Sequence, residues 1–140
     1  MSLFLQSFAQ RFSTLDAGCL EKLEALYSPD IAFRDPLHQI HGLPALQAYF
    51  AKLYANVQDV RYDFHDADEA APGRGYLRWT LHFRHPRLAG GGLISLEGCS
   101  HLCWTDRVHL HQDYFDAGAL LYEQVPVLGS VVGWLKGRLA

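Results

Sequence analysis

The chain has 140 residues, the length of one domain, and a domain of this size buries enough surface to fold without disulfides or a structural metal. Hydrophobic residues make up 49% and aromatic residues 13% of the sequence, which excludes a disordered chain. The formal net charge is −3 and the Lys and Arg residues form no cluster, which argues against nucleic acid binding.

Targeting signals and disulfides are not expected. Met1 to Leu5 are apolar but follow no basic segment, and the longest apolar stretch, Val125 to Leu135, is too short to cross a bilayer. A cytoplasmic protein is therefore predicted. The cysteine count is three, and Cys99 and Cys103 are about 13 Å apart if both lie on one strand. All three cysteines are predicted to be reduced thiols.

The first third of the chain reads mainly as helices. Apolar residues recur at helical spacing over residues 2–15, and again over 20–27 until Ser28-Pro29-Asp30. Residues 31–35 alternate between apolar and polar and predict a short strand. Gly42 and Pro44 open a third helix, whose apolar stripe extends to Val57.

After Val57 the apolar period changes to two, which indicates strands. The expected strands cover residues 60–65, 77–83, 93–104 and 108–116, with turns between them. Short connections between sequential strands predict an antiparallel meander. Helices packed on the concave face of a curved antiparallel sheet give the α+β class, and they leave an apolar cavity between the two layers.

The tail, residues 117–140, is expected to be helical in two pieces that are broken at Pro126. Its second piece has an apolar stripe and ends with Lys136 and Arg138; the stripe comprises Leu128, Val131, Val132, Leu135 and Leu139. This stripe is predicted to dock on the sheet edge or on a partner subunit. The alternative is contact with a membrane surface, for which two cations are weak support.

Two segments resemble a known family. They are residues 26–36, followed by Ile40-His41-Gly42, and the late segment His111-Gln112-Asp113-Tyr114-Phe115-Asp116. Both resemble the nuclear transport factor 2-like superfamily, which includes ketosteroid isomerase, SnoaL-like polyketide cyclases and limonene epoxide hydrolase. The resemblance covers nearly the whole chain, residues 1–140. It implies a cystatin-like cone, a homodimer formed through the convex sheet face, and a pocket that needs no cofactor.

Asp35 is the first candidate catalytic residue. The resemblance places it where ketosteroid isomerase has its general base, and the alternative is a carboxylate that caps the turn before Pro36. The isomerase also needs a Tyr and a protonated Asp as oxyanion donors. Those positions fall at Arg11, with Phe12 beside it, and near Ser100, so classical steroid isomerisation is not expected.

Asp113 is the second candidate, because related hydrolases and cyclases have a functional carboxylate in the last strand. On a strand, His109, His111, Asp113 and Phe115 share one face, so His111 and Asp113 could form an acid/base pair. That face is predicted to point into the pocket, and the alternative is a polar stripe on the outer face. An epoxide hydrolase reaction is not favoured, because Glu97 faces away from Asp113.

The strand register near Asp106-Arg107 decides between two kinds of site. A two-residue turn places Ser100 opposite Asp113, Leu102 opposite His111 and Trp104 opposite His109, as in a pocket wall. A three-residue turn would bring His101 to His111 and Cys103 to His109, as in a metal cluster. The first register is favoured, and no metal is predicted.

Two functions remain open. The leading one is a pocket for a small hydrophobic ligand with proton transfer of the isomerase or cyclase type, in which Asp35, Asp113 and His111 act as acid and base. The other is a non-catalytic ligand-binding or dimeric assembly domain. The residues expected to contact the ligand are Ser100, Phe12, Phe50, Tyr54, Trp79, Phe83, Leu102, Trp104 and Phe115.

Overall fold

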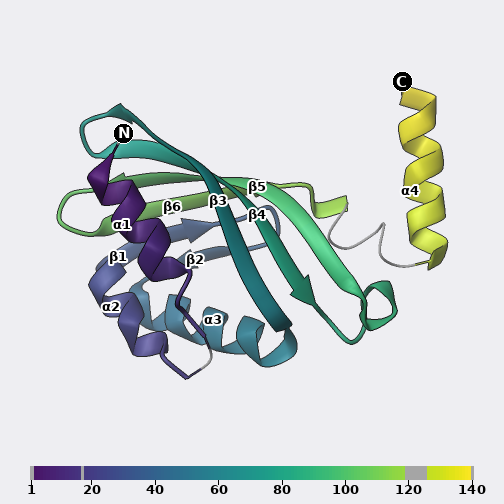
Figure 1. The fold of residues 1–140 in the computed structure, drawn as a ribbon, viewed down its shortest axis with the longest axis horizontal. Coiled ribbons are helices and arrows are strands. Elements are labelled where there is room, and N and C mark those ends of the chain that lie inside the picture. The colour runs from purple at the N-terminus through teal and green to yellow at the C-terminus, as the bar shows by residue number, and fades with distance from the viewer. Residues whose placement is uncertain (1, 17, 119–125, 140) are drawn as a thin grey trace.

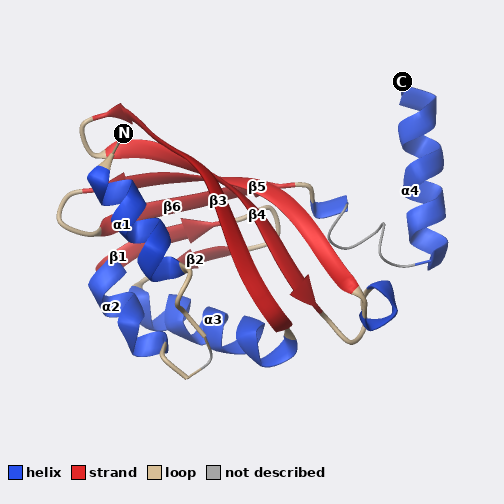
Figure 2. Cartoon of the chain, in the orientation of Figure 1, coloured by secondary structure: helices blue, strands red, loops and turns tan. Residues whose placement is uncertain are grey.

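The structure, a computed structural model, describes residues 2–16, 18–118 and 126–139. It has the predicted α+β class, with the N-terminal helices gathered on one face of a strongly curved sheet (Figures 1 and 2). The helices are α1 (Leu3–Phe12), α2 (Leu23–Leu26), α3 (Leu43–Asn56) and α4 (Pro126–Leu139). The strands are β1 (Tyr27–Arg34), β2 (Gln39–His41), β3 (Gln58–Ala71), β4 (Arg74–Arg84), β5 (Leu93–Trp104) and β6 (Val108–Phe115).

The sheet is six-stranded, in the order β2-β1-β6-β5-β4-β3. The antiparallel meander β3 to β6 is as predicted, but β1 pairs with β6 in parallel, so the sheet is mixed. This pairing brings together strands that are far apart in the chain, for example Phe33 opposite His111, and no local pattern reveals such a partner. The short β2, which pairs with β1, was also not predicted.

The N-terminal helices are shorter than expected. The Ser2 hydroxyl caps α1 by accepting a hydrogen bond from the Leu5 amide at 3.2 Å, and the helix ends at Phe12. The second predicted helix is a 3-10 turn (Leu20–Lys22) followed by one turn of α2. Tyr27 already belongs to β1, which continues through Pro29, and its fully buried side chain bonds to His111 on β6.

The core lies between the helices and the concave sheet face. Buried residues recur along α1 and α3 at helical spacing and alternate along β4 and β5, as the apolar pattern predicts. The indole of Trp79 lies against β5 at Gly98, where a Cβ atom would overlap with the ring. The glycine therefore lets the largest core side chain lie flat on the sheet.

The β5–β6 register follows the first of the two predicted alternatives over most of its length. Ser100 lies opposite Asp113 and Leu102 lies opposite His111. A bulge then shifts the pairing, so Trp104 lies opposite Val108, and the prediction that it faces His109 is wrong. Because the bulge absorbs one residue, His109 is exposed and does not share the face of His111.

The register of the metal alternative does not occur. His101 lies opposite Gln112 rather than His111. Over the described ranges, no group of three or more His, Cys, Asp or Glu side chains is arranged to hold a metal ion. All three cysteines are free thiols.

The C-terminal helix α4 begins at Pro126, where a helix was predicted to restart, and it stands apart from the sheet in Figure 1. The expected first piece of the tail falls largely on residues outside the described ones. Trp134 is 61% exposed and Val131 and Leu135 are each 49% exposed, so these side chains do not dock on the body of this chain. Within the described ranges, no helix is long and apolar enough to span a membrane.

Candidate functional site

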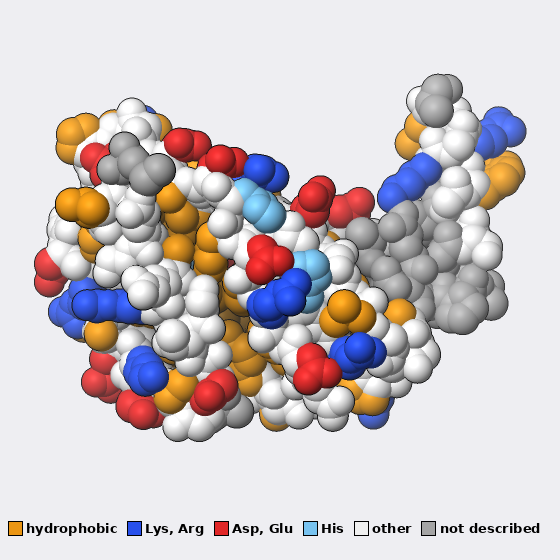
Figure 3. All heavy atoms as spheres, in the orientation of Figure 1, with side chains coloured by type: hydrophobic (Ala, Val, Ile, Leu, Met, Phe, Trp, Pro, Cys, Tyr) orange, Lys and Arg blue, Asp and Glu red, His pale blue; other side chains and the backbone are white. Residues whose placement is uncertain are grey.

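The concave face of the sheet encloses a cavity of about 270 Å³ together with α1 and α3. In the space-filling view, apolar side chains are visible in a furrow between the helices and the strands (Figure 3). Eight of the predicted site residues line the cavity: Phe12, Asp35, Phe50, Tyr54, Trp79, Phe83, Asp113 and Phe115.

The other four predicted residues lie behind the cavity wall. Ser100 and His111 border a second space of about 10 Å³, which is too small for a ligand. Leu102 is fully buried in the core, and Trp104 stacks on Phe4 with ring centroids 4.6 Å apart. The structure therefore places Leu102 and Trp104 in the packed core, and neither residue lines the cavity of about 270 Å³.

Asp113 carries one engaged and one open carboxylate oxygen. Oδ1 accepts hydrogen bonds from the Ser100 hydroxyl at 2.5 Å and from Nε2 of His111 at 2.7 Å. Oδ2 has no hydrogen-bond partner among the described residues. Every fully buried side-chain polar atom of these residues has a partner, so Oδ2 is not fully buried. It is therefore accessible, and because Asp113 lines the large cavity, Oδ2 can meet a ligand there.

A buried hydrogen-bond chain holds the ring of His111 between Tyr27 and Asp113. The hydroxyl of Tyr27 lies 2.8 Å from Nδ1 of His111, and it has no other partner in the described part of the chain. Because a buried hydroxyl hydrogen needs an acceptor, Tyr27 donates to Nδ1. Nε2 then carries the hydrogen and donates to Asp113.

Ser100 is held by Trp79. The Nε1–H of Trp79 donates to the Ser100 hydroxyl oxygen at 2.9 Å, which leaves the serine hydrogen to point at Asp113. The polar chain thus extends from Tyr27 on β1, through β6 and β5, to Trp79 on β4. It fixes the Asp113 side chain from both sides, so the open oxygen is held in place before any ligand arrives.

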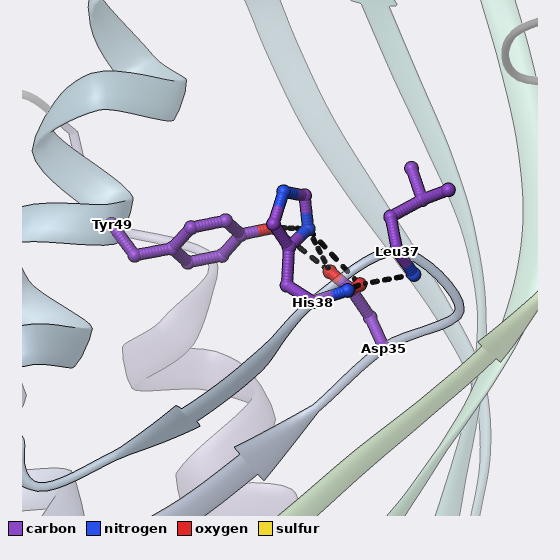
Figure 4. Close-up of polar contacts among 4 residues, drawn as sticks. All are labelled: Asp35, Leu37, His38 and Tyr49. Atoms are coloured by element: carbon purple, nitrogen blue, oxygen red, sulfur yellow. Dashed lines mark hydrogen bonds and ion pairs between the residues drawn. The ribbon is translucent and has the colours of Figure 1, made fainter.

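Asp35 lies at the cavity and also caps the turn, so both predicted placements occur together (Figure 4). Its Oδ1 accepts hydrogen bonds from the amides of Leu37 at 2.8 Å and His38 at 2.7 Å, and Nδ1 of His38 lies 3.1 Å away. Its Oδ2 accepts a hydrogen bond from the Tyr49 hydroxyl at 2.8 Å. Both oxygens are engaged by groups of the protein.

Tyrosine phenols add donors to the cavity. Burial, followed by hydrogen bonding to Asp35, raises the pKa of Tyr49 above its usual range. Burial raises the pKa of Tyr54 to about 12, and it raises the pKa of Tyr62 with a further contribution from the charge of Asp113. These phenols stay protonated at neutral pH and can donate hydrogen bonds.

Several cavity residues were not predicted. Tyr62 lies on the inward-facing alternation of β3, and Tyr49 lies on the apolar stripe of α3, so both could have been read from periodicity. Phe33 on β1 and His38 in the loop after it also line the cavity. His38 carries no local signal, because its place depends on how the turn after Asp35 closes.

Comparisons with known proteins support the fold. Among solved structures, the chain is similar to TsrD from Streptomyces laurentii, at 17% identity and a TM-score of 0.73, over 89% of this chain and 96% of that one. A putative SnoaL-like polyketide cyclase from Shewanella putrefaciens also has a TM-score of 0.73, at 17% identity, over 91% of this chain and 98% of that one. Both similarities show the fold alone.

A third structure is a hypothetical protein with a ketosteroid isomerase-like fold from Catenulispora acidiphila, in complex with trimethylamine. It matches at 12% identity and a TM-score of 0.73, over 89% of this chain and 92% of that one. No curated protein matches the chain. The family model described as a SnoaL-like domain matches residues 8–108. The chain therefore belongs to the SnoaL-like domain family and has the nuclear transport factor 2-like fold.

Proposed function

We propose that the cavity binds a small, mainly apolar ligand and that Asp113 accepts a proton from it without a cofactor. The observation that carries this proposal is the asymmetry of the Asp113 carboxylate. Ser100 and His111 hold Oδ1, while Oδ2 is open at an apolar cavity. A fixed carboxylate with an open lone pair in an apolar site is the arrangement that a general base requires.

Asp35 is the less suitable base. Four donors of the protein surround its two oxygens, so a ligand would have to displace one of them. Its exposed fraction is 8%, and its contacts hold the turn between β1 and β2. We assign Asp35 to positioning the turn and the Tyr49 hydroxyl at the cavity.

Hydrogen-bond donors for the other end of the ligand are available in the same cavity. Tyr54 and Tyr62 line it, and no hydrogen bond to either hydroxyl occurs within the described ranges. Because their pKa values are raised by burial, both are donors at neutral pH. A phenol can stabilise negative charge that develops on a ligand oxygen when Asp113 removes a proton.

The experiment follows exchange of a carbon-bound proton. 2-Tetralone, a bicyclic ketone with acidic C–H groups, is incubated with the protein in D2O, and loss of its proton signals is followed by NMR. The protein should accelerate the exchange, and Asp113→Asn should lower the rate by about 100-fold or more. Asp68→Asn, which changes an exposed carboxylate of β3, should leave the rate unchanged.

The rival function is binding without turnover. If 2-tetralone shifts the amide resonances of cavity residues but its exchange rate stays at the buffer value, the cavity is a binding site only. An unchanged exchange rate in a folded Asp113→Asn variant would contradict the role proposed for this carboxylate.

A further inference from the structure

We infer that the ligand of this cavity is a compact organic cation, namely a tertiary or quaternary amine with apolar substituents. The inference rests on the proposed function and names the chemical class that the same cavity accepts. Three features of the wall carry it: the aromatic rings in its lining, the sign of the charged groups and the open oxygen of Asp113.

Aromatic rings surround the cavity from several directions. Phe12 meets Phe50 at an interplanar angle of 72° and Tyr62 at 79°, and Tyr62 meets Trp79 at 79°. These rings pack against one another edge to face, and all four residues belong to the lining of the cavity. Ring faces are negative, and Trp and Tyr attract cations most strongly. The wall is therefore rich in aromatic rings that can attract a cation.

The charged groups of the wall are negative. Asp35 and Asp113 line the cavity, and no Lys or Arg does so within the described part of the chain. His111 donates a hydrogen bond to Asp113 from behind the wall and does not line the cavity. Burial, followed by the electrostatic influence of Tyr54 and then of Asp113, raises the pKa of Tyr62.

Two further histidines face the cavity. Nδ1 of His85 accepts the amide hydrogen of Arg87, so this nitrogen carries no proton. His38 contacts Asp35 with 47% of its side chain exposed, and it can neutralise only that carboxylate. Asp113 therefore has no Lys or Arg partner in the described part of the cavity wall. A ligand cation would supply a positive charge there.

The apolar character of the cavity selects among cations. A primary ammonium is strongly hydrated and loses this hydration on entering an apolar site. A tertiary or quaternary amine spreads its charge over apolar substituents, which also contact the rings. A tertiary ammonium can in addition donate its N–H to Oδ2 of Asp113, the oxygen with no partner within the described ranges.

The test uses two ligands of nearly the same shape. Phenyltrimethylammonium and tert-butylbenzene differ mainly in charge, and both are small enough for a cavity of about 270 Å³. Binding is measured from amide chemical shifts of the folded protein. The cation should bind at least about tenfold more tightly than its neutral counterpart. Asp113→Asn should reduce this preference to about threefold or less, and Asp68→Asn should preserve it.

A second variant tests the rings. Tyr54→Leu keeps the side chain apolar but removes a ring face, so it should weaken binding of phenyltrimethylammonium more than binding of tert-butylbenzene. Equal binding of the two ligands, tighter binding of the neutral one, or no binding of either would overturn the inference. Failure of the proposed function is detected separately, by the absence of 2-tetralone exchange. The two outcomes are thus distinguishable.

Discussion

Nε2 of His111 lies 2.7 Å from Oδ1 of Asp113, two residues further along the same strand. This bond joins the core to the cavity, because His111 is 3% exposed and bonds Tyr27 on its other side. A substitution of Tyr27 should therefore affect Asp113 at the cavity through His111, although the Tyr27 side chain does not line the cavity. Four predictions follow the same reasoning from contacts to measurable effects.

Tyr27→Phe removes the hydroxyl that donates to Nδ1 of His111. The buried nitrogen is left without a partner, which costs about 1–3 kcal/mol of unfolding free energy. Guanidinium unfolding curves measure this loss. Tyr76→Phe is the matched control on the outer sheet face, where the tyrosine is 40% exposed, and it should change the value by less than about 0.5 kcal/mol. Equal effects of the two variants would contradict a structural role for the Tyr27–His111 bond.

Asp35 and Tyr49 should be energetically coupled. The Tyr49 hydroxyl donates to a carboxylate that also holds the turn after β1. In a double-mutant cycle of Asp35→Ala and Tyr49→Phe, we expect a coupling of about 1–3 kcal/mol in unfolding free energy. A cycle of Asp106→Ala with Tyr49→Phe serves as control, because Asp106 does not contact Tyr49, and its coupling should be below about 0.5 kcal/mol. A similarly small value for Asp35 would show that the bond is not formed in solution.

Stability should fall at alkaline pH. Burial raises the pKa of Tyr54 to about 12, and burial also raises the pKa of Tyr27, Tyr49 and Tyr62 in the folded state. As pH rises above about 10, the unfolded chain loses these phenolic protons first, so the unfolding free energy decreases. The contribution is complete below about pH 10 and, for Tyr54, is lost as pH rises through about 12.

Denaturant unfolding at several pH values between 8 and 12 measures this slope. Tyr54→Phe should make the slope shallower, whereas Tyr76→Phe should not. A titration of tyrosinate absorbance in the folded protein should show buried phenols that ionise later than exposed ones. If all phenols ionise together near pH 10 while the protein remains folded, the burial of these side chains is contradicted.

Removal of the tail should have little effect on the body of the domain. Truncation after Gln124 deletes α4, whose residues Val131, Trp134 and Leu135 are about half exposed or more. Little apolar burial is lost, so we expect the unfolding free energy to change by less than about 2 kcal/mol. Sedimentation in parallel reports the oligomeric state. A large loss of stability together with dissociation would show that a second copy covers the α4 stripe.

Periodicity in the sequence was enough to predict the sheet meander and the inward-facing side chains. A two-residue turn was expected at Asp106-Arg107, and it predicted correctly that Ser100 meets Asp113 and Leu102 meets His111. The strands are joined by three residues instead, and the bulge between Cys103 and Trp104 restores the expected register. The sequence pattern could not predict the bulge, because a bulge preserves the pairing on one side and alters it on the other. The parallel β1–β6 pair was missed for a different reason, since it depends on the path of the whole chain.

The residues of the candidate site also divide into those that the sequence pattern could predict and those that it could not. Residues that alternate along one strand, such as Trp79 and Phe83, were placed at the cavity by their pattern. The partners of Asp35 come from a loop and from α3, so Tyr49 and His38 could not be joined to it from spacing alone. Trp104 was misplaced because the bulge and its stacking on Phe4 bring it into the core.

The contact between Trp79 and Gly98 makes the capacity of this cavity depend on two positions that face each other across strands. The indole occupies room that the absent side chain at residue 98 leaves open. A larger residue at 98 must push the ring toward the ligand space, and a smaller ring at 79 would deepen that space. Exchanges at this pair are therefore a direct route by which a relative of this chain could acquire a different ligand size while keeping the same sheet.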